Sequence, residues 1–101
     1  MNINELIEKL EEEWDVDGFL GRVREGVFSV AEGENFLKLL SSIQIPDDAL
    51  IPKRLLSLLW YIPLFLGWQD SRVAKIQGST EEYTRFVTEV INLLEDVLGY
   101  P

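Results

Sequence analysis

The chain has 101 residues, of which 47% are hydrophobic and 27% charged, a composition that predicts one folded domain and excludes a disordered chain. It contains no Cys and no His, which excludes disulfides, thiol nucleophiles and the usual imidazole bases and metal ligands. The formal net charge is −9, and residues 1–35 hold ten acids against three bases, a charge that disfavours nucleic acid and anionic membranes as partners. This negative charge either attracts a cationic partner or only maintains solubility.

The amino terminus shows no basic segment followed by an apolar run, because Asn2, Asn4 and Glu5 follow Met1. We therefore expect no signal peptide. Together with the absence of Cys, this favours a cytoplasmic protein without disulfides.

The first two predicted helices show apolar residues at the spacing i, i+3, i+4, i+7. One covers residues 3–13. The next starts with Asp15 or Asp17 as its cap and ends near Glu25, where Gly26 is typical of a helix end.

A third helix is predicted from about Val30 to Ser42. Ser29 precedes it as a cap, and Glu32 follows three residues later, which is the spacing of a capping box. Residues 44–48 are predicted to form a loop, because Pro46 disfavours a helical conformation at the residue before it.

The most apolar segment is 55–68, with the sequence LLSLLWYIPLFLGW. Apolar residues on all sides predict a central helix buried all round, with Trp60 in the core. The segment is shorter than the roughly 20 apolar residues that span a membrane. Pro63 is expected to bend or end the helix. Residues 67–78 are expected to form a connection, with room for a helical turn near Arg72 to Lys75.

The last helix begins at the capping-box sequence Ser79-Thr80-Glu81-Glu82 and holds one apolar face from Tyr83 to Leu98. No stretch alternates apolar and polar residues as a strand does. We therefore expect a single all-α domain over residues 1–101, a bundle of four to five helices around the central apolar helix 55–68.

Paired acids are the only pattern that suggests catalysis. Glu5-x-x-Glu8 and Glu12-x-x-Asp15 are similar to the acid pairs with which helical pyrophosphohydrolases hold magnesium, but here both pairs fall on one helix and its exit. A metal site needs acids that converge from separate elements, so these pairs are interpreted as a solvated helix face. We expect no enzyme activity, no metal and no cofactor.

Two tryptophans suggest a binding role. If Trp14 or Trp68 is exposed beside the acids of residues 11–17, an aromatic anchor with an acidic rim results, which is typical of a protein-binding patch. The alternative is that both only fill the core.

The segment 6–43, LIEKLEEEWDVDGFLGRVREGVFSVAEGENFLKLLSSI, resembles small helical immunity proteins of contact-dependent inhibition and related polymorphic toxin systems. The resemblance covers the N-terminal 45 residues or so and includes no catalytic motif. It implies a tight one-to-one complex with a cognate toxin, often a nuclease, made in the same cell. The residues that carry this resemblance are Trp14, Gly18, Phe19, Leu20, Arg24, Gly26 and Phe28.

The function expected from these observations is an immunity-type inhibitor that binds a basic toxin domain through its acidic N-terminal third. The alternative is a non-inhibitory interaction module, or a subunit of a homodimer buried through residues 60–68. The oligomeric state, monomer or dimer, is left open. The expected contact residues are Glu8, Glu11, Glu12, Glu13, Trp14, Asp15 and Asp17.

Overall fold

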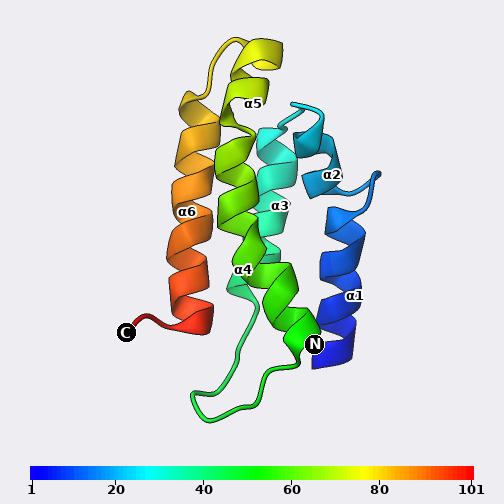
Figure 1. Cartoon of the computed structure of the whole chain (residues 1–101), viewed down its shortest axis with the longest axis vertical. Coiled ribbons are helices and arrows are strands. Elements are labelled where there is room, and N and C mark those ends of the chain that lie inside the picture. Colours follow the sequence, from blue (N-terminus) through cyan, green and yellow to red (C-terminus); the bar gives the residue numbers. More distant parts are fainter.

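The computed structural model describes residues 1–101 and contains six helices and no strand, which confirms the all-α prediction. The four long helices are α1 (Ile3–Trp14), α3 (Val30–Ser41), α4 (Lys53–Trp68) and α6 (Glu81–Leu98). They run along the long axis of the molecule, and α4 lies in front of α3 (Figure 1). The two short helices, α2 (Phe19–Arg24) and α5 (Asp70–Gln77), lie at one end.

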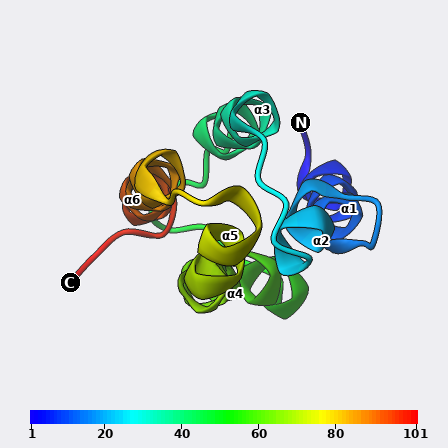
Figure 2. The ribbon, with the colours of Figure 1, turned by 90° about the horizontal axis from the view of Figure 1, so that it is seen from above.

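Seen along its long axis, the molecule places α3 and α4 on opposite sides, with α6 on one flank and α1 on the other (Figure 2). α4 packs against α1, α5 and α6, and α3 packs against α6 and α2. α4 therefore has helices beside it and behind it but none in front. The prediction of a central helix buried all round is wrong for this outer side.

Local signals explain where most helices begin and end. The Asn2 side chain accepts a hydrogen bond from the Glu5 N–H at 2.8 Å, and the Ser29 hydroxyl accepts one from the Glu32 N–H at 3.3 Å. Gly26 adopts a φ of +85° just after α2, a conformation that L side chains rarely adopt. Ser29 and Gly26 thus mark helix ends as the sequence predicts, and Asn2 caps α1. The Glu32 carboxylate accepts from Arg22 instead of completing a capping box with Ser29.

Two capping predictions are wrong. α2 starts after Gly18, without a side-chain cap, because the Asp15 carboxylate instead accepts from the Val16 N–H in the turn after α1. At the start of α6 the Ser79 hydroxyl accepts only from the Glu81 N–H, at 3.4 Å, so the capping box does not form.

The helices enclose one hydrophobic core of 20 buried residues. Phe19, Phe28, Phe36 and Phe86 meet in a cluster between α2, α3 and α6, with ring centroids 5.2 to 6.3 Å apart. The inner side of α4 fills the rest of the core with Leu55, Leu58, Leu59, Ile62, Phe65 and Leu66.

α4 continues through Pro63 to Trp68, and its ribbon changes direction in its middle (Figure 1). This confirms a bend, because Pro63 cannot donate a hydrogen bond to the preceding turn. Residues 70–77 form a helix where a connection was expected. The Tyr83 hydroxyl donates to the Leu66 carbonyl at 2.6 Å and ties this junction of α4 and α5 to α6.

Candidate protein-binding site

The outer side of α4 exposes a row of large apolar side chains. Leu56, Trp60, Leu64 and Trp68 recur every four residues and are 43%, 49%, 43% and 63% exposed. Tyr61 lies beside this row and is 37% exposed. We call these five residues the aromatic face.

No charged residue interrupts the aromatic face, because residues 55–68 contain none. Soluble monomers rarely expose a contiguous apolar patch of this kind, and such patches mark sites where another molecule binds. The prediction that Trp60 lies in the core is therefore wrong. No local signal in the sequence separates this side of α4 from its core side, because residues 55–68 are apolar all round.

The aromatic rings of this surface contact one another edge to face. The Tyr61 ring lies 5.6 Å from Trp60 and 5.7 Å from Trp68, measured between centroids, with interplanar angles of 78°. On its other side Tyr61 lies 5.9 Å from Trp14. These mutual contacts restrict the rings, so the rings lose less conformational entropy when a partner binds them.

Trp14 joins the aromatic face to α1. Its indole N–H donates to the Leu58 carbonyl at 3.1 Å, and its ring packs edge-on against Phe65 at 4.9 Å. Trp14 is half-buried, so it holds α1 against α4 instead of standing free as an anchor. Beside it lies an open pocket of about 330 Å³, lined by Trp14, Arg54, Ser57, Leu58, Trp60 and Tyr61.

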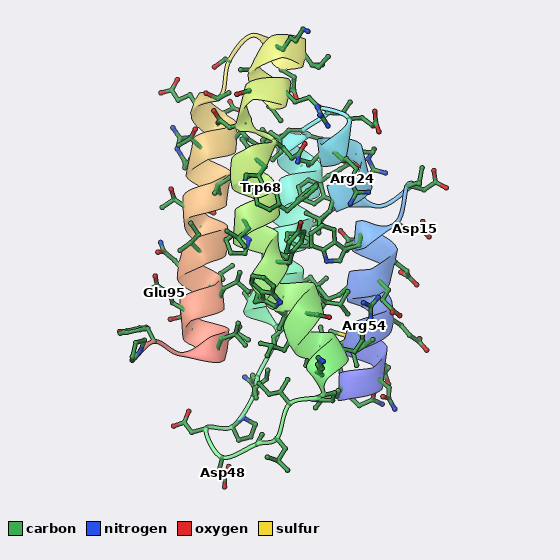
Figure 3. All side chains as sticks on the ribbon, viewed as in Figure 1. Asp15, Arg24, Asp48, Arg54, Trp68 and Glu95 are labelled. Carbon is green, nitrogen blue, oxygen red and sulfur yellow. The ribbon has the colours of Figure 1, made fainter.

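The edge of the aromatic face next to α1 and α2 carries two arginines. The Arg54 guanidinium donates to one Glu11 carboxylate oxygen from two nitrogens, at 2.8 and 3.0 Å, across the gap between α4 and α1. Arg24 lies over the Phe65 ring, 5.3 Å from its centroid. Figure 3 shows Arg54 and Trp68 on the broad side formed by α4.

The acids expected to contact a partner are spread around α1 and its exit. Glu8 and Glu12 are exposed, and no ion pair engages them. Glu11 lies at the edge of the aromatic face through its pair with Arg54. Asp15 follows α1 and points away from the bundle (Figure 3), and Asp17 is exposed in the same turn, where its carbonyl accepts from Arg22.

Glu13 differs from the other acids because it is half-buried on the side of α1 that faces α3. Burial raises the pKa of the Glu13 carboxyl, and the nearby positive charge of Arg22 opposes this rise only in part. Arg22 itself donates to the Glu32 carboxylate of α3. Glu13 therefore lies near a partly exposed pair of charges, Arg22 and Glu32, and away from the aromatic face.

The structure thus places three features of the candidate site side by side: the aromatic face, the pocket beside Trp14 and the acidic outer side of α1. No three Asp or Glu side chains converge as a metal site would require. No helix is both long enough and apolar enough to cross a bilayer. The chain matches no protein-family model, no curated protein and no solved structure.

Proposed function

We propose that this chain is an immunity-type inhibitor, which neutralises a basic toxin domain by docking against it and catalyses no reaction. The observation that carries the proposal is the aromatic face of α4, an exposed apolar surface without a charge over residues 55–68. An inhibitor of this kind acts in the cytoplasm of the cell that makes the toxin.

The shape of the site favours a protein partner over a small molecule. Small-molecule sites are concave and bury most of the ligand, whereas the aromatic face is a ridge on the outside of a helix. Exposed Trp and Tyr side chains dominate the binding energy of many protein interfaces. Trp60, Tyr61 and Trp68 supply three such anchors side by side.

The charge beside the aromatic face favours a basic partner. α1 packs against α4, and it exposes Glu8 and Glu12 next to the turn that carries Asp15 and Asp17. A negative field of this kind speeds the encounter with a positively charged surface. The anchors then hold the complex, because desolvated aromatic contacts govern dissociation more than association.

The proposal requires a toxin encoded beside this chain. We expect its gene to adjoin that of a large secreted protein, and the C-terminal domain of that protein is the binding probe. Surface plasmon resonance should show tight binding by the wild type and by Leu50→Glu. Leu64→Glu should bind at least about 100-fold more weakly, because a carboxylate at the centre of the aromatic face would be desolvated.

Leu50 is the matched control, because it is an exposed leucine in the loop before α4 and receives the same new charge. Circular dichroism should show that both variants are folded. Equal binding by Leu64→Glu and the wild type contradicts the proposed site. Binding without inhibition of the toxin's activity supports a non-inhibitory interaction module instead.

A further inference from the structure

We infer that, before a partner binds, the aromatic face of α4 pairs with the aromatic face of a second copy of the chain in an antiparallel dimer. The dimer would cover the apolar surface while no toxin is bound. Only this masking role rests on the proposed function, because self-association is a property of the chain alone.

The side chains of the row are complementary to the same row turned end to end. The row Leu56, Trp60, Leu64 and Trp68 is centred on Ile62. Antiparallel pairing about that centre places Trp60 of one copy beside Leu64 of the other, and Leu56 beside Trp68. Each large side chain then lies next to a smaller one, which is how rows with i, i+4 spacing interlock when two helices cross at about 50°.

The charges at the two ends of the row favour the antiparallel direction. Lys53 begins α4 and Asp70 lies just beyond its end, and neither forms an ion pair within the chain. Antiparallel pairing brings Lys53 of one copy to the end that holds Asp70 in the other, whereas parallel pairing places Lys53 beside Lys53. Arg54 and Arg72 are engaged within the chain, by the Glu11 carboxylate and the Arg24 carbonyl.

The surface also permits close approach of a second helix. Gly67 is exposed on α4, and a side chain added there would meet nothing within 4 Å. Because Gly67 has no side chain, nothing projects there between Leu64 and Trp68 to hold a second helix away. Because the contact is limited to one side of one helix, we expect a reversible dimer and not a permanent one.

The dimer and the toxin complex should respond to salt in opposite directions. Each copy carries a net charge of −9, so two copies repel each other, and added salt weakens this repulsion. Binding of a basic toxin is driven by attraction, which the same salt weakens. Dimerisation should therefore strengthen with salt while toxin binding slows.

Sedimentation equilibrium of the purified chain at low and high salt tests the inference. We expect a monomer–dimer equilibrium that shifts toward dimer as salt rises, and the same behaviour for Leu50→Glu. Leu64→Glu should be monomeric at every concentration. A wild type that stays monomeric at every concentration and salt level, or a Leu64→Glu variant that still dimerises, overturns the inference.

The absence of Cys allows a direct test of the direction of pairing. A single spin label on Ser71→Cys, an exposed position at the start of α5 that leaves Lys53 and Asp70 unchanged, should give a distance of about 27 Å along α4 and α5 in the antiparallel dimer, since about 18 residues at 1.5 Å per residue separate the two labels. A distance near that of two packed helix axes, about 10 Å, would show parallel pairing and contradict the inference.

The two proposals fail separately. A monomeric chain that binds and inhibits the toxin domain overturns the dimer and leaves the proposed function intact. If the chain forms the dimer but no neighbouring toxin domain binds its aromatic face, the proposed function is overturned and the dimer stands. If both hold, the toxin complex should contain one chain and one toxin domain, because the two partners compete for one surface.

Discussion

Trp14 and Trp60 lie on either side of Tyr61 but meet solvent differently. The Trp14 indole N–H donates to the Leu58 carbonyl, whereas the Trp60 indole has no hydrogen-bond partner in the protein. A buried indole N–H needs such a partner, and an exposed one is satisfied by water. Trp14 therefore serves the fold, and Trp60 remains available for binding.

Replacing each tryptophan by Ala should separate these roles. We expect Trp14→Ala to lower the free energy of unfolding by about 3 kcal/mol, because it removes packing against Phe65 and a hydrogen bond. Trp60→Ala should change it by less than about 1 kcal/mol, as is usual for surface positions. Urea denaturation measures both, and a larger loss for Trp60→Ala would show that Trp60 supports the core.

Glu13 makes stability depend on pH in a predictable direction. Burial raises the pKa of its carboxyl, so the folded chain favours the protonated form and loses stability as pH rises through that raised pKa. Glu13→Gln should therefore be more stable than the wild type at neutral pH. The difference should vanish below about pH 4, where the carboxyl is protonated in both the folded and the unfolded chain.

Urea denaturation of Glu13→Gln and the wild type across this pH range provides the measurement. The control is Glu8→Gln, which removes an exposed charge of the same helix that is not among the charges acting on Glu13. A Glu13→Gln variant that is less stable than the wild type at neutral pH would show that attraction to Arg22 outweighs the cost of burial.

At the scale of single elements, two glycines in helices have opposite surroundings. A side chain at Gly21 of α2 would overlap the carbonyl oxygen of Asp15 and lie 2.8 Å from that of Val16, whereas one at Gly67 of α4 would meet open space. Gly21 thus lets α2 pack directly on the turn that follows α1.

Alanine at these two positions should therefore have opposite effects on stability. Gly21→Ala should cost at least about 3 kcal/mol of unfolding free energy, because backbone must move to relieve the overlap. Gly67→Ala should add about 0.5–1 kcal/mol, since Ala favours an exposed helix over Gly. Thermal unfolding followed by circular dichroism can rank both against the wild type, and a stable Gly21→Ala would contradict the packing of α2.

Helix positions were largely predictable from the sequence, because caps and helical spacing act over a few residues. Ser29 and Gly26 mark helix ends as expected. Residues 70–77 were not predicted as a helix, although they carry local signals: Asp70 lies in the first turn, and Gly78 ends the helix with a φ of +79°. The apolar spacing of this segment is too short to reveal it, because only Val73 is buried.

The binding surface was less predictable than the fold. Glu8 and Glu12 were correctly predicted to lie on an exposed side of α1. Spacing alone could not show that the next acid, Glu13, faces α3. α4 is apolar on both sides, and only the arrangement of α1, α3 and α6 decides which side remains exposed. The candidate aromatic anchors therefore come from α4. Of the two tryptophans that the sequence suggested, Trp68 is among them and Trp14 is not.

At the scale of the whole molecule, charge and apolar surface are separated. The outer side of α1 and its exit carry Glu8, Glu12, Asp15 and Asp17, while the neighbouring α4 carries no charge over residues 55–68. Steering acts over a Debye length of about 10 Å and needs no contact, whereas apolar anchoring needs close packing. The two surfaces can therefore act in sequence on one partner.

Charge reversal tests the steering step. At low salt, the double variant Glu8→Lys, Glu12→Lys should slow association with the basic toxin domain at least about tenfold, with a smaller effect at high salt. The control Glu34→Lys, Glu89→Lys changes the net charge equally on exposed acids of α3 and α6. Equal slowing by both pairs would show that total charge, and not the side of α1, guides the partner.

The location of the partner is measured most directly by oxidative footprinting of the toxin complex against the dilute free chain. Trp60 and Trp68 should become protected from hydroxyl radicals. Tyr100, which is 76% exposed beyond the end of α6, should react equally in both samples. A complex in which Trp60 and Trp68 stay as reactive as in the free chain would contradict docking through the aromatic face.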